Sequence, residues 1–351
     1  MIKRKSGQLV SILFGALIVI IVGVFLLDLI FGSVSIPFRK VFTILFGGDV
    51  KSSWNYIVLN FRLPKALTAI FVGAGLSVTG LMMQTLFRNP LAGPFVLGIS
   101  SGASLGVALM VMASAIVPVF FGTISAFLGS WALVVAAVAG ASLVFLLVAL
   151  ASIRISDSVS LLIIGIMFGS ITGAVVNILQ YFSDPEQIQS FIVWTFGSLA
   201  GVTWNEMQVM GPIVLIGLIM AFLLIKPMDA LLLGENYARG VGISVNRIRI
   251  AVIISTALIA GTLTAFTGPI AFVGVAVPHI ARAIFRTASH KVLMPAVVLI
   301  GAAIMLTCDI ISQIPGNQNT LPINSVTALF GGPVVIWVIM RSRNVKASFA
   351  G

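Results

Sequence analysis

Residues able to carry acid–base, metal or nucleophilic chemistry are scarce in this sequence of 351 residues, which contains nine acidic residues, two histidines and one cysteine. Neither His279 nor His290 belongs to an H-E-x-x-H metal motif, and no G-x-x-x-x-G-K-[ST] loop is present to hold nucleotide phosphates. We therefore expect no enzyme activity, no metal site and no cofactor bound by this chain, and a structural role for His279. If the protein uses ATP, another polypeptide must hydrolyse it.

One polar, glycine-punctuated stretch, GENYARGVGISVN, runs from Gly234 to Asn246. Glu235 and Arg239 have the spacing of a helical ion pair, and Glu235 would lie in the first turn, where a carboxylate suits the helix dipole. Gly240 and Gly242 end the helix within two turns. The pattern predicts a short helix and leaves two interpretations open: a solvated connector, or a rigid element that receives a push from a cytosolic motor.

The elements that must position this stretch are membrane helices. The chain is 59% hydrophobic and 8% charged, whereas soluble domains have roughly 25% charged residues. A bilayer core of about 30 Å requires about 20 helical residues. We therefore predict an all-α integral membrane protein, a single transmembrane domain over residues 1–351 with a cytoplasmic loop at about 227–247. The ten predicted spans are 6–27, 66–87, two within 89–153 that are divided near Pro118, 158–182, 207–225, 250–266, 269–285, 292–311 and 322–340. The short apolar centre of residues 187–205 predicts an interfacial helix instead.

The basic residues indicate the orientation of these spans. With both termini in the cytoplasm, 15 of the 20 Lys and Arg residues lie on the cytoplasmic side, as the positive-inside rule requires. The five exceptions belong to the first outer loop and its junction with the second span: Arg39, Lys40, Lys51, Arg62 and Lys65. The net charge of +11 does not indicate nucleic-acid binding, because the basic residues are scattered in small groups at the edges of apolar runs, where they meet anionic lipid.

Three stretches resemble a known family. Arg62 to Gly106, Leu231 to Val245 and Gly268 to Phe285 are similar to motifs of the FecCD family of ABC importer permeases, in the same order. The resemblance implies the membrane subunit of a bacterial cytoplasmic-membrane importer for iron-siderophores, haem or cobalamin, with the ten-helix fold typical of the family. It also implies a second permease copy, two ATPase subunits that carry ATP and Mg, and an extracytoplasmic substrate-binding protein.

The resemblance also assigns roles to individual residues. The expected ATPase-coupling surface consists of Gly234, Glu235, Ala238, Arg239 and Gly242. Arg62 and Lys65 match cations that meet acidic residues of the binding protein, although Lys65 could instead anchor the span at the interface. Asn89, Leu91, Asp157 and Ser158 are expected to line the inner gate, while the simpler interpretation gives Asn89 a capping role.

The resemblance fails at two positions. Gln313 and Thr320 stand where the family commonly has an arginine and a glutamate, so we expect one docking cation fewer and a less acidic partner. An ATP-independent carrier or channel remains the alternative function. An ion-coupled carrier is less favoured, because Asp28 and Asp309 lie near the outer ends of their spans and not at mid-membrane. The cargo is left open among siderophore, haem and cobalamin, as is the choice between a homodimer and a heterodimer.

Overall fold

A computed structural model describes residues 2–32, 34–48, 50–113, 118–155, 158–313 and 320–341. Within these ranges the chain is helical and has no β-strand. The α-helices are α1 (Ile2–Ile30), α2 (Phe38–Leu45), α3 (Ser52–Ile57), α4 (Leu63–Leu86), α5 (Ile99–Met112), α6 (Pro118–Leu128), α7 (Ala132–Arg154), α8 (Ser158–Tyr181), α9 (Pro185–Thr195), α10 (Trp204–Leu223), α11 (Ile225–Leu232), α12 (Glu235–Gly240), α13 (Val245–Thr256), α14 (Thr262–Thr267), α15 (Val273–Phe285), α16 (His290–Ser312) and α17 (Ile323–Arg341). Two π-helical segments, η1 (Val58–Arg62) and η5 (Ala257–Gly261), join α3 to α4 and α13 to α14.

The apolar helices confirm the prediction of an all-α membrane protein. Seven helices of the described chain are long and apolar enough to span a bilayer, and α5, α15 and α17 are shorter apolar helices. Together they fall where the ten spans were predicted. The third span differs in its start, because residues 94–97 form the 3-10 helix η2 and Gly98 is left-handed, so α5 begins only at Ile99. The short helix α6 between the third and fourth spans was not predicted.

Helix α4 forms the centre of the bundle and is buried along nearly its whole length. Small residues let its neighbours approach its backbone directly. A Cβ atom added at Gly73 would overlap the carbonyl oxygen of Gly301 in α16, and one added at Gly80 would overlap that of Gly274 in α15. The core therefore rests on close backbone contact between helices.

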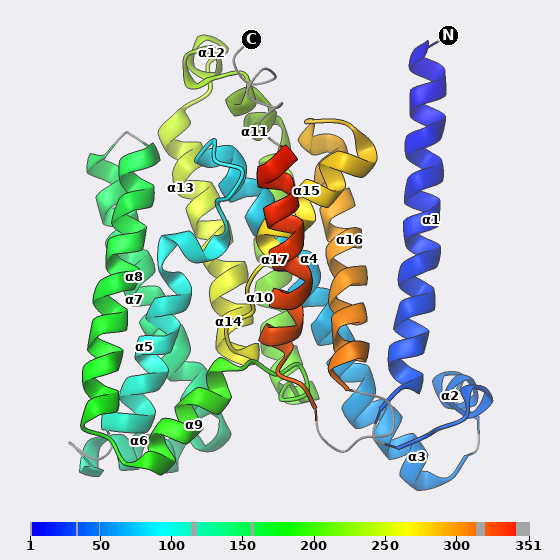
Figure 1. Cartoon of the computed structure of the whole chain (residues 1–351), viewed down its shortest axis with the longest axis vertical. Helices are drawn as coiled ribbons and strands as arrows, with labels where there is room; N and C mark the ends of the chain where they lie inside the picture. Colours follow the sequence, from blue (N-terminus) through cyan, green and yellow to red (C-terminus); the bar gives the residue numbers. More distant parts are fainter. Residues whose placement is uncertain are drawn as a thin grey trace.

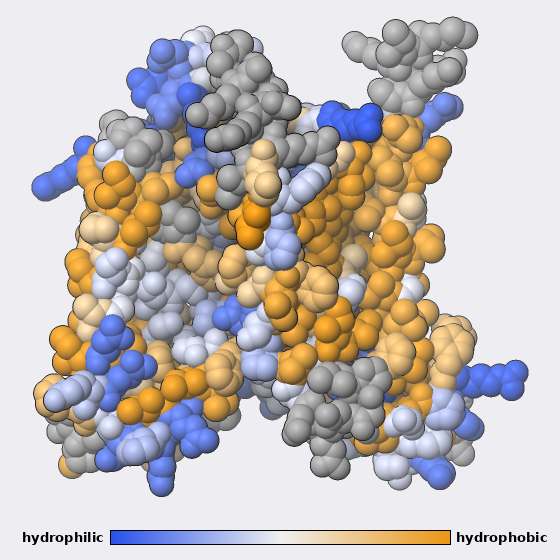
Figure 2. Space-filling view, in the orientation of Figure 1, coloured by the Kyte–Doolittle hydropathy of each residue, from blue (hydrophilic) through white to orange (hydrophobic). Residues whose placement is uncertain are grey.

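The two ends of the bundle carry different short elements (Figure 1). Helices α11 and α12 lie at the same end as the start of α1 and the last turn of α17, and we call this the α12 end. Helices α2, α3, α6 and α9 lie at the opposite end, the α2 end. Helix α9 is the predicted short helix after the fifth span and begins with an Asp184–Gln187 capping box. Between the ends, Figure 2 shows hydrophobic side chains over much of the visible face, including the exposed flank of α1.

Candidate coupling site and outer network

The short helix predicted from GENYARG is present as α12. Gly234 precedes it with φ of +121°, and Gly242 follows it with φ of +81°. These backbone conformations favour glycine over residues with a side chain. The amide of Ile243 donates to the carbonyl of Ala238 at 2.9 Å and closes the turn after the helix. The two glycines thus set the direction in which the chain enters and leaves α12.

Glu235 joins α12 to the membrane helices. Its carboxylate lies 3.4 Å from Arg239, as the i to i+4 spacing predicted, and 3.5 Å from Arg249 in α13. Arg249 is only 1% exposed and also donates to the carbonyl of Ile155, just after α7, at 3.4 Å. Sequence reasoning missed Arg249; its signal was an arginine directly before an apolar run. The contact fastens α12 to two different spans.

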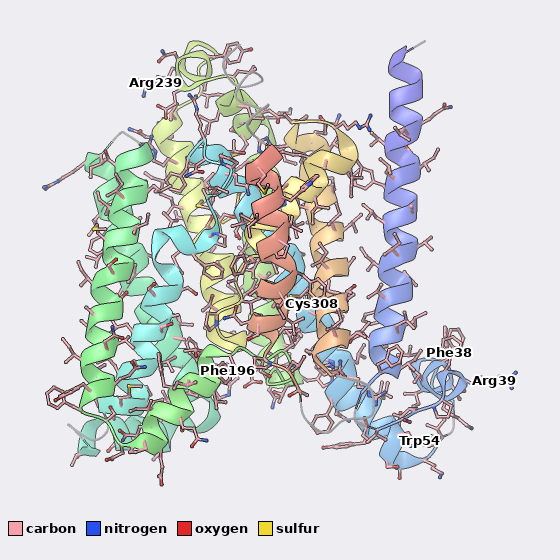
Figure 3. The ribbon with its side chains drawn as sticks, in the orientation of Figure 1. Phe38, Arg39, Trp54, Phe196, Arg239 and Cys308 are labelled. Atoms are coloured by element: carbon pink, nitrogen blue, oxygen red, sulfur yellow. The ribbon has the colours of Figure 1, made fainter. Side chains whose placement is uncertain are left out.

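One residue of the expected coupling surface is not exposed on α12. Ala238 is fully buried, so its side chain packs inward beneath the helix. Tyr237 and Val241 are exposed, and Arg239 projects at the tip of the α12 end (Figure 3). The coupling role of the five residues stays a prediction. A partner that touches α12 would meet Tyr237, Arg239 and Val241, and the small size of Ala238 serves internal packing.

Helix α11, which leads into α12, is bonded to the core by Asp229. The Asp229 carboxylate accepts from the amide of His290 at 2.7 Å, lies 2.8 Å from His290 Nδ1, and accepts from the Ser289 hydroxyl at 3.1 Å. His290 Nε2 lies 2.9 Å from Thr85 Oγ1 near the end of α4. Arg88 adds a separate contact to α11, because it donates to the carbonyl of Leu231 at 3.4 Å. Asp229 therefore caps α16 and links α11 to both α16 and α4.

The turn after α4 holds two of the predicted gate residues. Asn89 Oδ1 accepts from the amide of Leu91 at 2.9 Å, the capping arrangement expected of an asparagine in a turn, and Leu91 is exposed. His279 Nε2 lies 2.8 Å from the carbonyl oxygen of Pro90, which ties the turn to α15. Ser158 is the first residue of α8, and Asp157 lies outside the described residues. The gate role of these residues stays a prediction.

Arg62 lies at the α2 end and is 5% exposed. Its guanidinium donates to the carbonyl of Leu29 at 2.8 Å, to that of Ile30 at 2.7 Å, and to that of Val34. A Cβ atom at Gly32 would lie 2.7 Å from the guanidinium, so a side chain there would displace Arg62 from this position. Arg62 thus binds the end of α1 to the start of α4. Its docking role stays a prediction, but the side chain lacks the exposure that direct contact with a partner requires.

Lys65, the second expected docking cation, is also internal, with 8% exposure. Its Nζ lies 2.8 Å from the carboxylate of Asp309 in α16. Gln313 donates to the Asp309 carboxylate at 3.0 Å and to that of Asp28 in α1 at 3.3 Å. Two carboxylates, one lysine and one amide therefore join α1, α4 and α16. Because Gln313 belongs to this buried group, its identity bears on the packing of these helices more directly than on a docking surface.

The stretch GISSG, Gly98 to Gly102, matches the G-x-S-x-G pattern of serine hydrolases, which place the serine on a strand-to-helix turn beside a histidine. Here the stretch begins α5 and no strand precedes it in the described chain. Both histidines are engaged elsewhere, His279 with Pro90 and His290 with Asp229 and Thr85. The described residues contain no cluster of His, Cys, Asp and Glu that could hold a metal ion.

Ten apolar spans in the described chain, one of them the buried central helix α4, define a polytopic membrane protein with the bonded α11–α12 unit at one end. The comparisons identify its kind: the chain belongs to the FecCD transport family, whose sequence model matches residues 9–341. It is a permease of the ABC importer type, a transport subunit. The match extends through most of α1, further toward the N-terminus than the motifs that first suggested the family.

Two relatives match over most of their length. The hemin transport system permease protein HmuU of Yersinia pestis is 32% identical over 340 residues, which cover 96% of this chain and 97% of HmuU. The vitamin B12 import system permease protein BtuC of Klebsiella pneumoniae is 34% identical over 299 residues, with 85% and 86% covered. A solved inward-facing structure of a metal-chelate type ABC transporter superposes with a TM-score of 0.81 at 28% identity and covers 94% of this chain and 99% of its own.

Proposed function

We propose that this chain is the membrane subunit of an ATP-driven importer, and that the α11–α12 unit receives the movement of a separate ATPase subunit. The observation that carries the proposal is the attachment of this unit to the core. Arg249 fixes α12, and Asp229 fixes α11 to α16. A solvated connector requires no buried arginine, whereas an element that transmits force must be fastened to what it moves. This attachment favours the importer over an ATP-independent carrier or channel.

The cargo class follows from the relatives. Those described above are named for hemin and vitamin B12, and the solved neighbour for metal-chelate transport. All three names denote a metal held in an organic ligand. We propose a cargo of this class: haem, a cobalamin or an iron-siderophore.

The assembly comprises two permease copies, two ATPase subunits that bind ATP and Mg, and a substrate-binding protein at the α2 end. The α12 end and both termini face the cytoplasm, an orientation supported by the 15 of 20 basic residues on that side. Arg62 and Lys65 are committed to partners within the chain. We therefore propose that they support docking by holding α1, α4 and α16 together beneath the outer surface.

Uptake into proteoliposomes tests the function. Permease reconstituted with its ATPase should take up labelled haem, cobalamin or ferric siderophore only when ATP and Mg are present on the ATPase side. The ATPase should also co-purify with the permease in detergent. Uptake that continues without ATP, or a permease that purifies without any ATPase, would contradict the importer.

Site-directed labelling tests the orientation separately. Glu186 in α9 and Tyr237 in α12 are both exposed and lie at opposite ends of the bundle. Cysteines at these positions should react with an impermeant maleimide from opposite sides of the membrane, Glu186→Cys from outside. Buried Cys308 provides the unlabelled background. Labelling of both cysteines from one side would remove the proposed topology.

A further inference from the structure

Helix α2 has an aromatic row that no other part of the described chain covers. Phe38, Phe42 and Phe46 recur every four residues and are 54%, 47% and 76% exposed. Their rings follow one another, with centroids 6.2 Å apart for the first pair and 4.7 Å for the second. Val41 and Ile44, on another side of the helix, are buried. The helix therefore uses one apolar side to attach to the protein and presents a second one outward.

Two cations occupy the remaining side of α2. Arg39 and Lys40 are exposed, and neither forms an ion pair among the described residues. At 3.6 residues per turn, Lys40 lies about 160° around the helix from Phe42, and Arg39 lies between the aromatic row and Lys40. Lys51, the next basic residue, has its Nζ 5.1 Å from the ring of Trp54. Around its axis, α2 thus has three sides in order: an apolar side that packs on the protein, an exposed aromatic side, and a cationic side.

The position of α2 relates these sides to the membrane. Figure 1 shows α2 beside the lower turns of α1, at the outer edge of the bundle. Helix α1 exposes Ile18, Val19, Val22 and Leu27 along its length. Figure 2 shows that the hydrophobic surface of α1 continues onto α2, with hydrophilic groups projecting beyond it. In Figure 3 Arg39 points away from the body of the molecule, and Phe38 lies on the side nearer α1.

We infer that α2 lies in the membrane interface at the α2 end, with its phenylalanine row seated at the acyl boundary and Arg39 and Lys40 bound to phosphates of anionic phospholipid. An amphipathic helix with aromatic residues on one side and basic residues on another has the composition of an interfacial helix. If the phenylalanine row bound another protein, it would not have to be continuous with the lipid-facing surface of α1. The inference accounts for Arg39 and Lys40 among the five basic residues on the outer face, and it does not rest on the transport function.

Fluorescence quenching in nanodiscs of full-length protein tests the seating of the row. Phe42→Cys and Lys40→Cys, on opposite sides of one helix, are each labelled with an environment-sensitive fluorophore; wild-type protein treated with the same fluorophore controls for Cys308. Both side chains are exposed, so neither change alters the core. We expect spin-labelled lipid to quench the residue 42 label about threefold more than the residue 40 label, and aqueous iodide to show the opposite order. Equal iodide quenching at both positions would place the row in water and overturn the inference. A residue 42 label shielded from both quenchers would show that a protein, such as a second copy of the chain, covers the row, and would overturn it as well.

The lipid composition tests the headgroup contact. Lipid quenching of the residue 42 label should be stronger in nanodiscs that contain phosphatidylglycerol than in phosphatidylcholine alone. Arg39→Gln combined with Lys40→Gln should remove this difference, while Lys51→Gln, whose cation contacts Trp54, should retain it. Identical quenching in the two lipids for the protein with both cations would overturn the binding of anionic phospholipid by Arg39 and Lys40.

Discussion

Two buried arginines fasten the two ends of this molecule in different ways. Among the described residues, Arg62 at the α2 end donates to backbone carbonyls at and after the end of α1. Arg249 at the α12 end contacts the carbonyl of Ile155 and also the carboxylate of Glu235, whose side chain is 32% exposed. Backbone carbonyls are fixed acceptors, whereas a partly exposed carboxylate can exchange one partner for another. The comparison indicates a permanent joint at the outer end and an exchangeable one where we propose that the ATPase binds.

The largest effect is expected from Arg62→Met. It removes the donors for three carbonyls near the end of α1, and each buried acceptor without a partner costs about 1–3 kcal/mol. We expect about 3 kcal/mol or more of lost stability, a lower unfolding temperature in detergent, and easier proteolysis between α1 and α2. Arg39→Met, on the exposed side of α2, is the control and should change neither. An unchanged unfolding temperature and unchanged protease resistance would show that Arg62 is not the joint.

Arg249→Met should have the next largest effect. Because Glu235 can regain water, we expect a loss of about 1–3 kcal/mol, less than for a fully buried pair. A double-mutant cycle with Glu235→Gln should give a coupling energy of about 0.5–3 kcal/mol in thermal unfolding. Strict additivity of the two changes would mean that the contact contributes nothing and that α12 is held by packing alone.

Asp229→Asn tests how firmly α11 is bonded to the start of α16. The variant keeps the size of the side chain but replaces charge-assisted hydrogen bonds to Ser289 and His290 with neutral ones, a difference of about 1 kcal/mol. We expect ATPase binding to persist while ATP-driven uptake slows, because α11 holds α16 less firmly. Asp184→Asn, in the capping box of α9 at the other end, is the matched control. If both variants transport at the normal rate, Asp229 does not transmit movement.

The smallest effect on stability is expected from Arg239→Gln. Its ion pair with Glu235 is exposed, and such helical pairs contribute about 0.3–0.5 kcal/mol. The unfolding temperature should hardly change. The affinity for the ATPase should nevertheless fall, and by more at low salt than at high salt, because the exposed guanidinium lies on the proposed contact face. Equal affinity for both proteins at every salt concentration would remove Arg239 from that face.

Local sequence patterns predicted the main elements of the fold. Long uncharged runs located the spans, because a bilayer imposes a length and a polarity that can be counted along the chain. The spacing of Glu235 and Arg239 predicted both the helix α12 and its internal ion pair, since residues four apart share a helical face. Gly98 and the two prolines before it, Pro90 and Pro94, delay the start of the third span. A count of uncharged residues does not detect such breaks.

The partners of buried polar side chains could not be predicted in the same way. The carbonyls bound by Arg62 lie about thirty residues earlier in the chain, and backbone groups leave no mark in a sequence. His290 and Asp229 are 61 residues apart in the chain, and no local pattern indicated that they pair. The inward direction of Ala238 depends on the φ angle of Gly234, which the sequence permits but does not determine. Lys65 looked like a surface cation because its partner Asp309 lies far along the chain, in α16.

The close crossing of α4 and α16 limits how these two helices can move relative to each other. Gly73 and Gly301 bring the two backbones together with no side chain between them that could change its rotamer. Sliding one helix along the other would move a residue that has a Cβ atom into this crossing, where even one methyl group overlaps a carbonyl oxygen. Helices α4 and α16 therefore cannot slide along each other at this crossing. Sliding movements in the transport cycle must occur at other helix pairs, and a crosslink between α4 and α16 beside the two glycines should leave the cycle intact.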